Sequence, residues 1–473
     1  MRSALAIRRW TREIRPMMAL AFPIMSGMVA QMLIGLSDTI MVGRVGVVPL
    51  AAAAFVIAIA HLPLVFGIGL LSSVAVLTAQ ACGARKPDEA GEVLRHGVLL
   101  GTVTGVLTAA SLVCLRPLLH LFGQPVEVVH ECGPFLTLFG LSMLPVLVAQ
   151  VFKQFAESLN HPWAPTFIML GGVMLNILLN WVLIFGNWGA SAMGLEGSGW
   201  ATLISRSAIA LALIVYVLTA KPLREFLPLK WLTRLVWDRL SRLLHLGWPV
   251  AAQHLMEVSA FVFAAIMVGW ISADAIAAHQ IAITCAATSF MFALGTGMAG
   301  CIRVGQAWGS GQLRRMRRIG FIGVLLATAM MACFAVLFVA AGDPLARLFT
   351  SSPAVIGLTV NLLLLAAIFQ VADAVQIAAI CALRGLADVR VPAIIAVLAY
   401  GAVAVPLGYT LGFPLHLGAV GIWIGLTAGL IVAAISLLWR FHRKTTGLEN
   451  RSQPERTDRS QAEPEIATSS AQL

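Results

Sequence analysis

Long apolar runs recur along the whole chain and limit what it can fold into. Each holds about 20 residues or more, the length a helix needs to cross a hydrocarbon core of about 30 Å. In lipid, backbone N–H and C=O groups must be paired within the protein, so such segments are helices. Hydrophobic residues make up 59% of the sequence and charged residues 11%, against roughly 45 to 50% apolar usage in soluble domains. The sequence therefore predicts an all-α polytopic membrane protein.

The apolar runs number twelve. We expect the spans at 17–42, 50–78, 96–122, 132–157, 165–186, 196–220, 245–271, 275–304, 319–342, 355–382, 391–412 and 417–441. Lys and Arg gather before the first span and after most even-numbered spans, whereas the opposite loops hold only Arg44, Arg116 and Arg347. Because short cytoplasmic loops are enriched in Lys and Arg, we expect both termini in the cytoplasm.

The formal net charge of +11 follows from the same arrangement. A basic balance can indicate nucleic-acid binding, but here the positive residues lie where membrane topology requires them, so no nucleic-acid partner is predicted. The first apolar run is too long for a signal peptide and is expected to be a retained helix. Seven cysteines lie in or beside apolar runs without CxxC spacing, as is typical of small core residues.

The chain repeats itself. A shift of 226 positions places Pro23 on Pro249, superimposes two IMVG tetrapeptides, and sets QACG at 80–83 on QAWG at 306–309. Farther along the register drifts slightly. The repeat divides the chain into two lobes of six spans each. Because six is even, both lobes enter the membrane in the same direction, and their symmetry axis runs along the membrane normal. Parallel repeats of this kind are typical of transporters.

The lobes are expected at 1–220 and 245–441, with two further segments outside them. Residues 221–244 join the lobes and place apolar residues at helical spacing among charged ones, which predicts a short amphipathic helix on the inner membrane surface. A plain linker held by acidic lipid is the alternative. Residues 442–473 are rich in Ser, Gln, Glu and Arg and are predicted to be a disordered cytoplasmic tail.

Three acids, Asp38, Glu257 and Asp373, lie inside predicted spans. An ionised side chain at mid-bilayer costs roughly 2.5 to 3.5 kcal/mol on insertion scales, so such residues bind a cation, exchange protons, meet substrate or pair with a buried base. We identify only Arg206 as a basic residue well inside a span, and it can neutralise one acid at most. Function is the favoured explanation for Glu257 and Asp373.

The acids differ in depth. The repeat aligns Glu257 with Gln31, which places Asp38 about 10 Å farther along its helix at 1.5 Å per residue. Glu257 and Asp373 are expected at similar depth, as a pair that could share a proton or a hard cation such as Na⁺.

The first lobe offers amides instead. Asn176 and Asn180 are four residues apart, so they share one helix face. With Asp38 and Thr202 they could line a hydrated cavity, and interhelical hydrogen bonding is the alternative.

Several stretches resemble one family of transporters. They are PIMSGMVAQMLIGLSDTIMVGRVG, GWPVAAQHLMEVSAF, FQVADAVQIAAICALRGLADVRVP and GAVGIWIG. Together they resemble the multidrug and toxic compound extrusion (MATE) family, in its bacterial NorM branch, over residues 10–441. The resemblance implies a twelve-helix antiporter, not an enzyme. It would export cationic amphiphilic drugs and dyes, fluoroquinolone-like compounds among them, by alternating access driven by Na⁺ or H⁺, without another cofactor.

The resemblance also assigns residues. It implies that Glu257 and Asp373 are the coupling-cation carboxylates, able to bind Na⁺. Asp38, Asn176, Asn180 and Thr202 are its polar cluster in the N-terminal lobe, where Asp38 also serves coupling. One departure concerns the family's IYQ pattern, which here reads IFQ and ends in Phe369 and Gln370. These two residues are expected at the cavity, where a ring face can still attract a cation.

Other functions are less favoured. A lipid-linked sugar flippase needs several basic residues in a lobe cavity, where we identify only Arg206. An intramembrane prenyltransferase needs DDxxD-like acidic clusters to hold Mg²⁺, and the sequence contains none. A passive channel would not move substrate against its gradient, and an ATP-driven pump would need a Walker motif.

The excess of Arg over Lys and the abundant Ala indicate a GC-rich bacterial genome. We therefore expect the protein in the bacterial inner membrane. We also expect it to be a monomer.

Overall fold

The computed structural model describes residues 2–228, 230–231 and 235–451, with the backbone alone at residues 2–9 and 451. The described residues form helices and no strands. The α-helices are α1 (Arg2–Gly43), α2 (Val47–Gly83), α3 (Pro87–Leu115), α4 (Val126–Leu141), α5 (Met143–Ser158), α6 (Trp163–Phe185), α7 (Gly194–Thr219), α8 (Trp237–Gly269), α9 (Ala273–Gly309), α10 (Leu313–Ala340), α11 (Gly342–Arg347), α12 (Pro353–Gly385), α13 (Arg390–Val397), α14 (Val405–Gly412) and α15 (Gly418–Arg451). Short 3₁₀ segments are η1 (Arg116–Phe122), η2 (Asn187–Gly189) and η3 (Lys221–Phe226), and η4 (Leu398–Ala404) is a π-helix.

Twelve segments of the described chain are long and apolar enough to cross a membrane, which confirms the expected fold. Three of them combine more than one element. The third joins α3 to η1, the fourth joins α4 to α5, and the eleventh runs through α13, η4 and α14. The break between α4 and α5 falls at Ser142, whose hydroxyl group donates to the Phe139 carbonyl at 2.6 Å.

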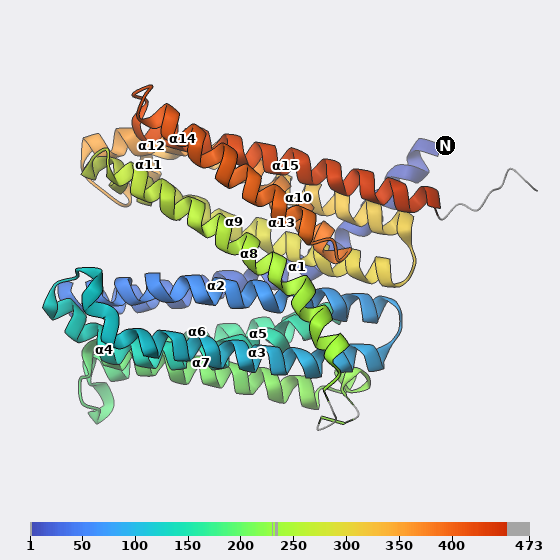
Figure 1. Ribbon diagram of the computed structural model, residues 1–473, viewed down its shortest axis with the longest axis horizontal. Coiled ribbons are helices and arrows are strands. Elements are labelled where there is room, and N and C mark those ends of the chain that lie inside the picture. The colour runs from blue at the N-terminus through green and yellow to red at the C-terminus, as the bar shows by residue number, and fades with distance from the viewer. Residues whose placement is uncertain (1, 229, 232–234, 452–473) are drawn as a thin grey trace, which may run out of the picture.

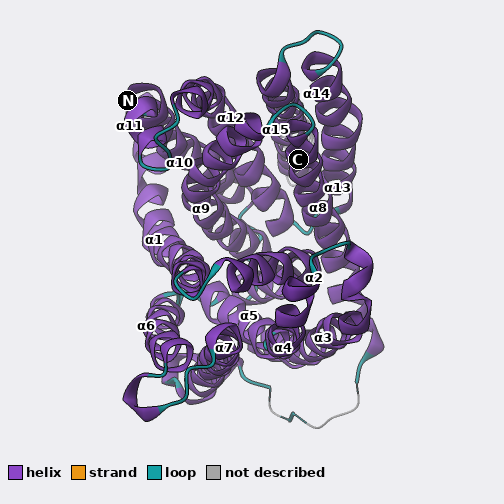
Figure 2. Ribbon diagram, turned by 90° about the vertical axis from the view of Figure 1, so that its left-hand side faces the viewer, coloured by secondary structure: helices purple, strands orange, loops and turns teal. Residues whose placement is uncertain are grey.

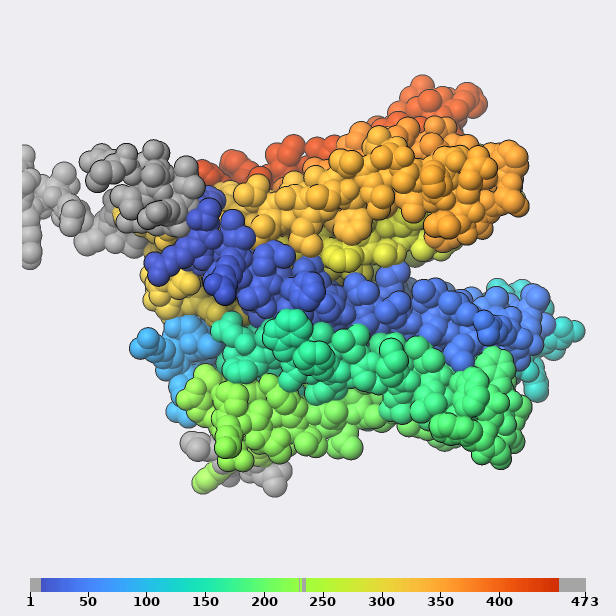
Figure 3. All heavy atoms as spheres, turned by 180° about the vertical axis from the view of Figure 1, so that it is seen from behind, coloured from blue at the N-terminus to red at the C-terminus, as the bar shows by residue number. Residues whose placement is uncertain are grey.

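The helices form two lobes, α1 to α7 and α8 to α15 (Figure 1). The lobes lie together at the end of the molecule that holds the N-terminus, which we call the terminal face, and they diverge toward the other end. Figure 2 shows the same two groups of helices viewed from that other end. The surface is hollowed between the lobes, and this cleft opens at the end opposite the terminal face (Figure 3).

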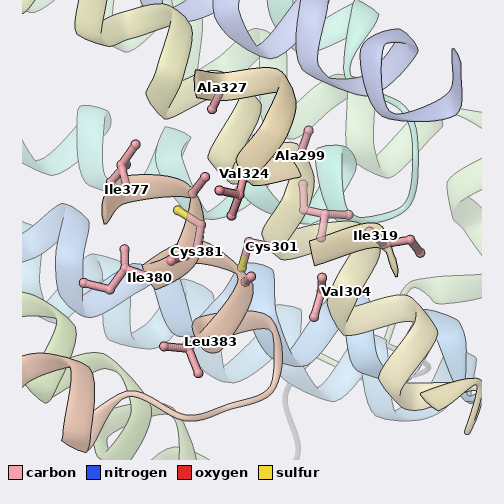
Figure 4. Close-up of a cluster of buried hydrophobic side chains, with 14 of the residues drawn as sticks. Ala299, Cys301, Val304, Ile319, Val324, Ala327, Ile377, Ile380, Cys381 and Leu383 are labelled. Atoms are coloured by element: carbon pink, nitrogen blue, oxygen red, sulfur yellow. The ribbon is translucent and has the colours of Figure 1, made fainter. Parts of the chain in front are cut away.

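The main contacts between the lobes come from α1, α2, α8 and α9. α2 packs on both α8 and α9, and α1 packs on α9. One buried apolar cluster spans this junction, because it contains Met17 of α1 and Val76 of α2 together with side chains of the second lobe. Figure 4 shows part of that cluster, with Cys301 and Cys381 between α9 and α12. The terminal face is therefore closed by a shared core.

The linker between the lobes differs from expectation. Residues 221–226 form η3, and residues 235 and 236 are not helical. The helix that follows begins at Trp237 and continues as the seventh span, α8. The predicted separate amphipathic helix is therefore wrong for the described part of 221–244; residues 229 and 232–234 lie outside the described residues.

The last helix also extends farther than expected. α15 continues to Arg451, so residues 442–451 are helical and not part of a tail. Two contacts explain the longer helix: Lys444 pairs with Asp388 at 3.0 Å, and Glu449 pairs with Arg317 at 3.0 Å. The rest of the expected tail, 452–473, lies outside the described residues.

Candidate functional site

The polar cluster of the first lobe is assembled from three helices. Asp38 comes from α1, Asn176 and Asn180 from α6, and Thr202 from α7. The Asn180 amide donates to one oxygen of Asp38, and the Thr202 hydroxyl group donates to the other at 3.4 Å. Asn180 also donates to the Asn176 carbonyl oxygen at 3.2 Å. Both asparagines and Thr202 are buried.

Two serines extend this cluster. Ser37 donates to Asn176 at 3.4 Å, and Asn176 donates to Ser205 at 3.5 Å. Asn180 keeps one unused acceptor, because its side-chain oxygen is buried and has no hydrogen-bond partner among the described residues. Together with the Asp38 carboxylate, that oxygen is a suitable ligand for a hard cation.

Arg206 does not neutralise Asp38 by direct contact. Its guanidinium group donates to Ser142 at 2.7 Å and lies 4.6 Å from the centre of the Phe139 ring. No ion pair within the described residues joins it to Asp38, although its charge acts on that carboxylate from a distance. Arg206 thus bonds the residue at the break between α4 and α5, and it leaves the carboxylate of Asp38 available to bind a cation.

In the second lobe, Glu257 of α8 is held by two amides. Gln253, one turn earlier on the same helix, donates to its carboxylate at 3.0 Å, and Gln376 of α12 donates to the same oxygen at 2.8 Å. Both glutamines are buried. The two bonds fix where the carboxylate of Glu257 points, toward the facing helix α12.

Asp373 lies on α12, three residues before Gln376, and has a different environment. Only 9% of its surface is exposed. No hydrogen bond or ion pair of the described residues involves its side chain, yet it is near enough to Glu257 for the two charges to interact. An ionised carboxylate in this position is uncompensated, which is costly unless a cation or a proton joins it.

A buried arginine completes this site and was missed in the sequence. Arg384, at the end of α12, is 3% exposed. It donates to Gln253 at 3.2 Å and contacts His254 at 2.9 Å. Gln253 therefore connects Arg384 to Glu257. The expectation that only Arg206 lies inside a span is wrong, since Lys153 and Arg303 are also buried inside spans.

The IFQ residues lie in the interior of the second lobe. Phe369 is buried, with its ring 6.0 Å from Phe261 and 5.8 Å from Trp423. Gln370 is fully buried and accepts a hydrogen bond from Ser289, while its own amide nitrogen has no partner in the described chain. Both residues support α12 next to Asp373 and belong to the packed lobe.

A tyrosine from another helix approaches the carboxylates. Tyr400 is buried within the π-helix η4, its ring 6.5 Å from Phe261 and its hydroxyl group beside Gln376. Isolated π-turns within helices frequently occur at functional sites. The sequence contained one available signal for this residue, an isolated tyrosine in an otherwise apolar span.

Two segments of the chain match a known protein family. A sequence model of the MatE family matches residues 23–182 and 249–410, more than half of the chain. The two matches begin at Pro23 and Pro249, the prolines that the 226-residue shift superimposes. The family model therefore recognises each lobe separately.

Curated relatives match over nearly the full length. "Probable multidrug resistance protein NorM" of Mesorhizobium japonicum is 35% identical over 442 residues, which cover 92% of this chain and 95% of that protein. The protein of the same name from Rhodopseudomonas palustris is 34% identical over 440 residues, with 92% and 93% covered.

Solved structures share the fold. One, described as an outward-facing conformation of a multidrug resistance MATE family transporter of the MOP superfamily, has a TM-score of 0.85 at 21% identity, covering 92% of this chain and 97% of that one. The eukaryotic MATE transporter AtDTX14 has a TM-score of 0.84 at 19% identity, covering 94% of this chain and 100% of its own.

Proposed function

Because the chain belongs to the MatE family, we propose that it is a multidrug efflux transporter of the bacterial inner membrane, which exchanges cationic amphiphilic drugs or dyes for Na⁺ or H⁺ by alternating access. Its curated relatives carry the name of a multidrug resistance protein. As a member of this family, the chain is a transporter and not an enzyme.

The observation that carries the proposal is the uncompensated Asp373 beside Glu257. The buried carboxylate of Asp373 lies near the half-buried carboxylate of Glu257 in one lobe, and the described residues give Asp373 no partner. Two carboxylates whose charges interact within one site cannot both remain ionised without a compensating cation. A site of this kind binds Na⁺ or takes up a proton, and it releases either when a cationic drug supplies the missing charge.

Exchange follows from linkage between the two ligands. An ion that lowers the affinity for a cationic drug is itself bound less tightly when the drug is present, by the same factor. The ion gradient alone then supplies the energy for drug export. In this account Glu257 and Asp373 bind the coupling ion, and Asp38 with Asn180 provides a second polar site in the other lobe.

The cleft supplies the path. It opens at the end opposite the terminal face, and we infer that the terminal face is cytoplasmic, because the loops there carry most of the Lys and Arg residues. The molecule would then be open to the outside, the state that releases drug and receives the ion. Rocking of one lobe against the other would expose the same sites to the cytoplasm.

The test is transport by the purified protein in proteoliposomes. Ethidium or norfloxacin flux would be followed with a Na⁺ gradient and a pH gradient imposed separately. Accumulation of drug against its own gradient, driven by one of the two ions, supports the proposal and identifies the ion. Drug movement that is unaffected by either the Na⁺ gradient or the pH gradient would contradict the proposal.

A further inference from the structure

The backbones of α2 and α9 touch at the terminal face, at two glycines. A Cβ atom on Gly83 would lie 2.0 Å from the carbonyl oxygen of Gln306, and one on Gly309 would lie 2.0 Å from the carbonyl oxygen of Gln80. No real side chain tolerates such a contact, so only glycine fits at either position while the lobes are in this arrangement. Close backbone approach at small residues is how membrane helices pack tightly.

Two glutamines beside these glycines reach across the junction. Gln80 of α2 donates through its side-chain amide to the carbonyl of Gly385, 3.0 Å away at the end of α12. Gln306 of α9 donates to the carbonyl of Ser158, 2.8 Å away at the end of α5. Helix ends leave carbonyl groups without partners in their own helix, so each glutamine satisfies a group of the opposite lobe.

The two sets of contacts are related by the internal repeat. Gln80 corresponds to Gln306 and Gly83 to Gly309 under the 226-residue shift. The acceptors Ser158 and Gly385 correspond under a shift of 227, the one that also relates Pro165 to Pro392. Exchanging the lobes therefore converts each contact into the other, and one pseudo-twofold axis passes through the junction.

A second pair of contacts repeats the symmetry along the same helices. A Cβ atom on Gly69 would lie 2.7 Å from the Cα atom of Ala251, and one on Gly295 would lie 2.9 Å from the Cα atom of Met25. These two pairs also correspond under the 226-residue shift. The close packing between the lobes is thus built from duplicated residues, and the QACG and QAWG motifs hold its outermost part.

We propose that Gln80, Gly83, Gln306 and Gly309 form a symmetric latch that holds the terminal face closed while the cleft is open at the other end. Both of its hydrogen bonds must break for the lobes to separate on the terminal side. We call these four residues the terminal latch. Its part in drug transport rests on the proposed function, whereas its effect on closure does not.

The chemistry of the latch suits a reversible closure. Neutral amide-to-carbonyl hydrogen bonds contribute modestly in net terms, because water replaces either partner when the interface opens. At the typical net contribution of one such hydrogen bond to stability, each bond shifts the ratio of closed to open states by about fivefold, and the two together shift it by about 25-fold.

The test measures closure directly in the purified full-length protein in lipid nanodiscs. Spin labels would be attached through an introduced keto amino acid at Lys86 and Gln312, so that the native cysteines stay in place. These positions are exposed, follow α2 and α9, and correspond under the 226-residue shift. Pulsed electron paramagnetic resonance then reports the distance between the lobes at the terminal face.

The variants are Gln80→Leu, Gln306→Leu and their combination. We expect each single variant to lower the closed-to-open ratio about fivefold and the double variant about 25-fold, seen as a second population at longer distance. Gly83→Ala should act in the same direction without removing a hydrogen bond. The control is Gly300→Ala on α9, where an added Cβ meets nothing within 4 Å, and it should leave the distances unchanged.

An unchanged distance distribution in both the double variant and Gly83→Ala would overturn the latch. A shift in one single variant and none in its counterpart would overturn its symmetry. Because the distances are measured without drug, a wild type that fails to transport would defeat the proposed function and leave the latch standing.

Discussion

Gln376 of α12 donates a hydrogen bond of 2.8 Å to Glu257 of α8, whereas Asp373, one turn away on α12, has no hydrogen-bond partner among the described residues. Two neighbouring carboxylates in one lobe, one half-buried and one buried, thus have different surroundings. Glu257 is oriented by amides, and Asp373 is left for a ligand. This difference leads to separate predictions for the two acids and for the groups around them.

Asp373→Asn should remove ion-coupled transport without destabilising the protein. The substitution eliminates an uncompensated buried charge, which is unfavourable for folding. We expect a melting temperature equal to or above that of the wild type in detergent without Na⁺, together with loss of uphill drug transport. A variant that still concentrates drug against its gradient would show that Asp373 does not carry the coupling ion.

Glu257→Gln should also insert normally and lose uphill transport. Gln253 and Gln376 can still bond the new amide oxygen, so the fold is retained while the negative charge is lost. Membrane expression and vesicle transport would be measured side by side. Normal drug export by this variant would be incompatible with a role in coupling.

Gln376→Leu should weaken ion binding more than it affects folding. It removes one of the two donors to Glu257, and a hydrogen bond to a charged group contributes about 1.5 to 3 kcal/mol. We expect the ion concentration for half-maximal transport to rise about tenfold or more. The control is Thr288→Val on α9, because among the described residues the exposed hydroxyl group of Thr288 bonds only the carbonyl of Thr284. An unchanged half-maximal concentration for Gln376→Leu would exclude this orienting role.

Asn180→Leu tests the first lobe. It removes the amide of Asn180 that donates to Asp38, so we expect impaired drug transport and a loss of stability of about 1 to 3 kcal/mol. Ser207→Ala on α7 is the matched control, since the exposed hydroxyl group of Ser207 bonds, within the described part of the chain, only the carbonyl of Leu203 on its own helix. Equal transport by the two variants would count against a functional cluster around Asp38.

Much of the site could be predicted because charged and amide side chains are rare in apolar spans. Asp38, Asn180 and Glu257 stood out for that reason, and helical spacing placed Asn176 beside Asn180. The repeat predicted two lobes and the correspondence of Gln80 with Gln306. In each case the signal is local in sequence or duplicated in it.

Contacts between distant helices could not be predicted in the same way. Arg384 was placed beyond the end of its span, because apolarity alone ended that helix at residue 382 and the structure continues it to Gly385. Tyr400 reaches the carboxylates through a π-helix that no sequence pattern indicated. The cross-lobe bonds of Gln80 and Gln306 depend on how the lobes meet, which the packing of α2 and α9 determines.

The most direct measurement is ion movement driven by drug. Proteoliposomes containing the wild type or Asp373→Asn would be loaded with Na⁺ at equal pH, and separately with a pH indicator in the absence of Na⁺. A gradient of ethidium would then be imposed while Na⁺ or H⁺ flux is recorded. We predict flux of one ion against the direction of drug movement in the wild type and none in Asp373→Asn. Equal ion flux in the two proteins, or no ion flux in a wild type that transports ethidium, would contradict the account.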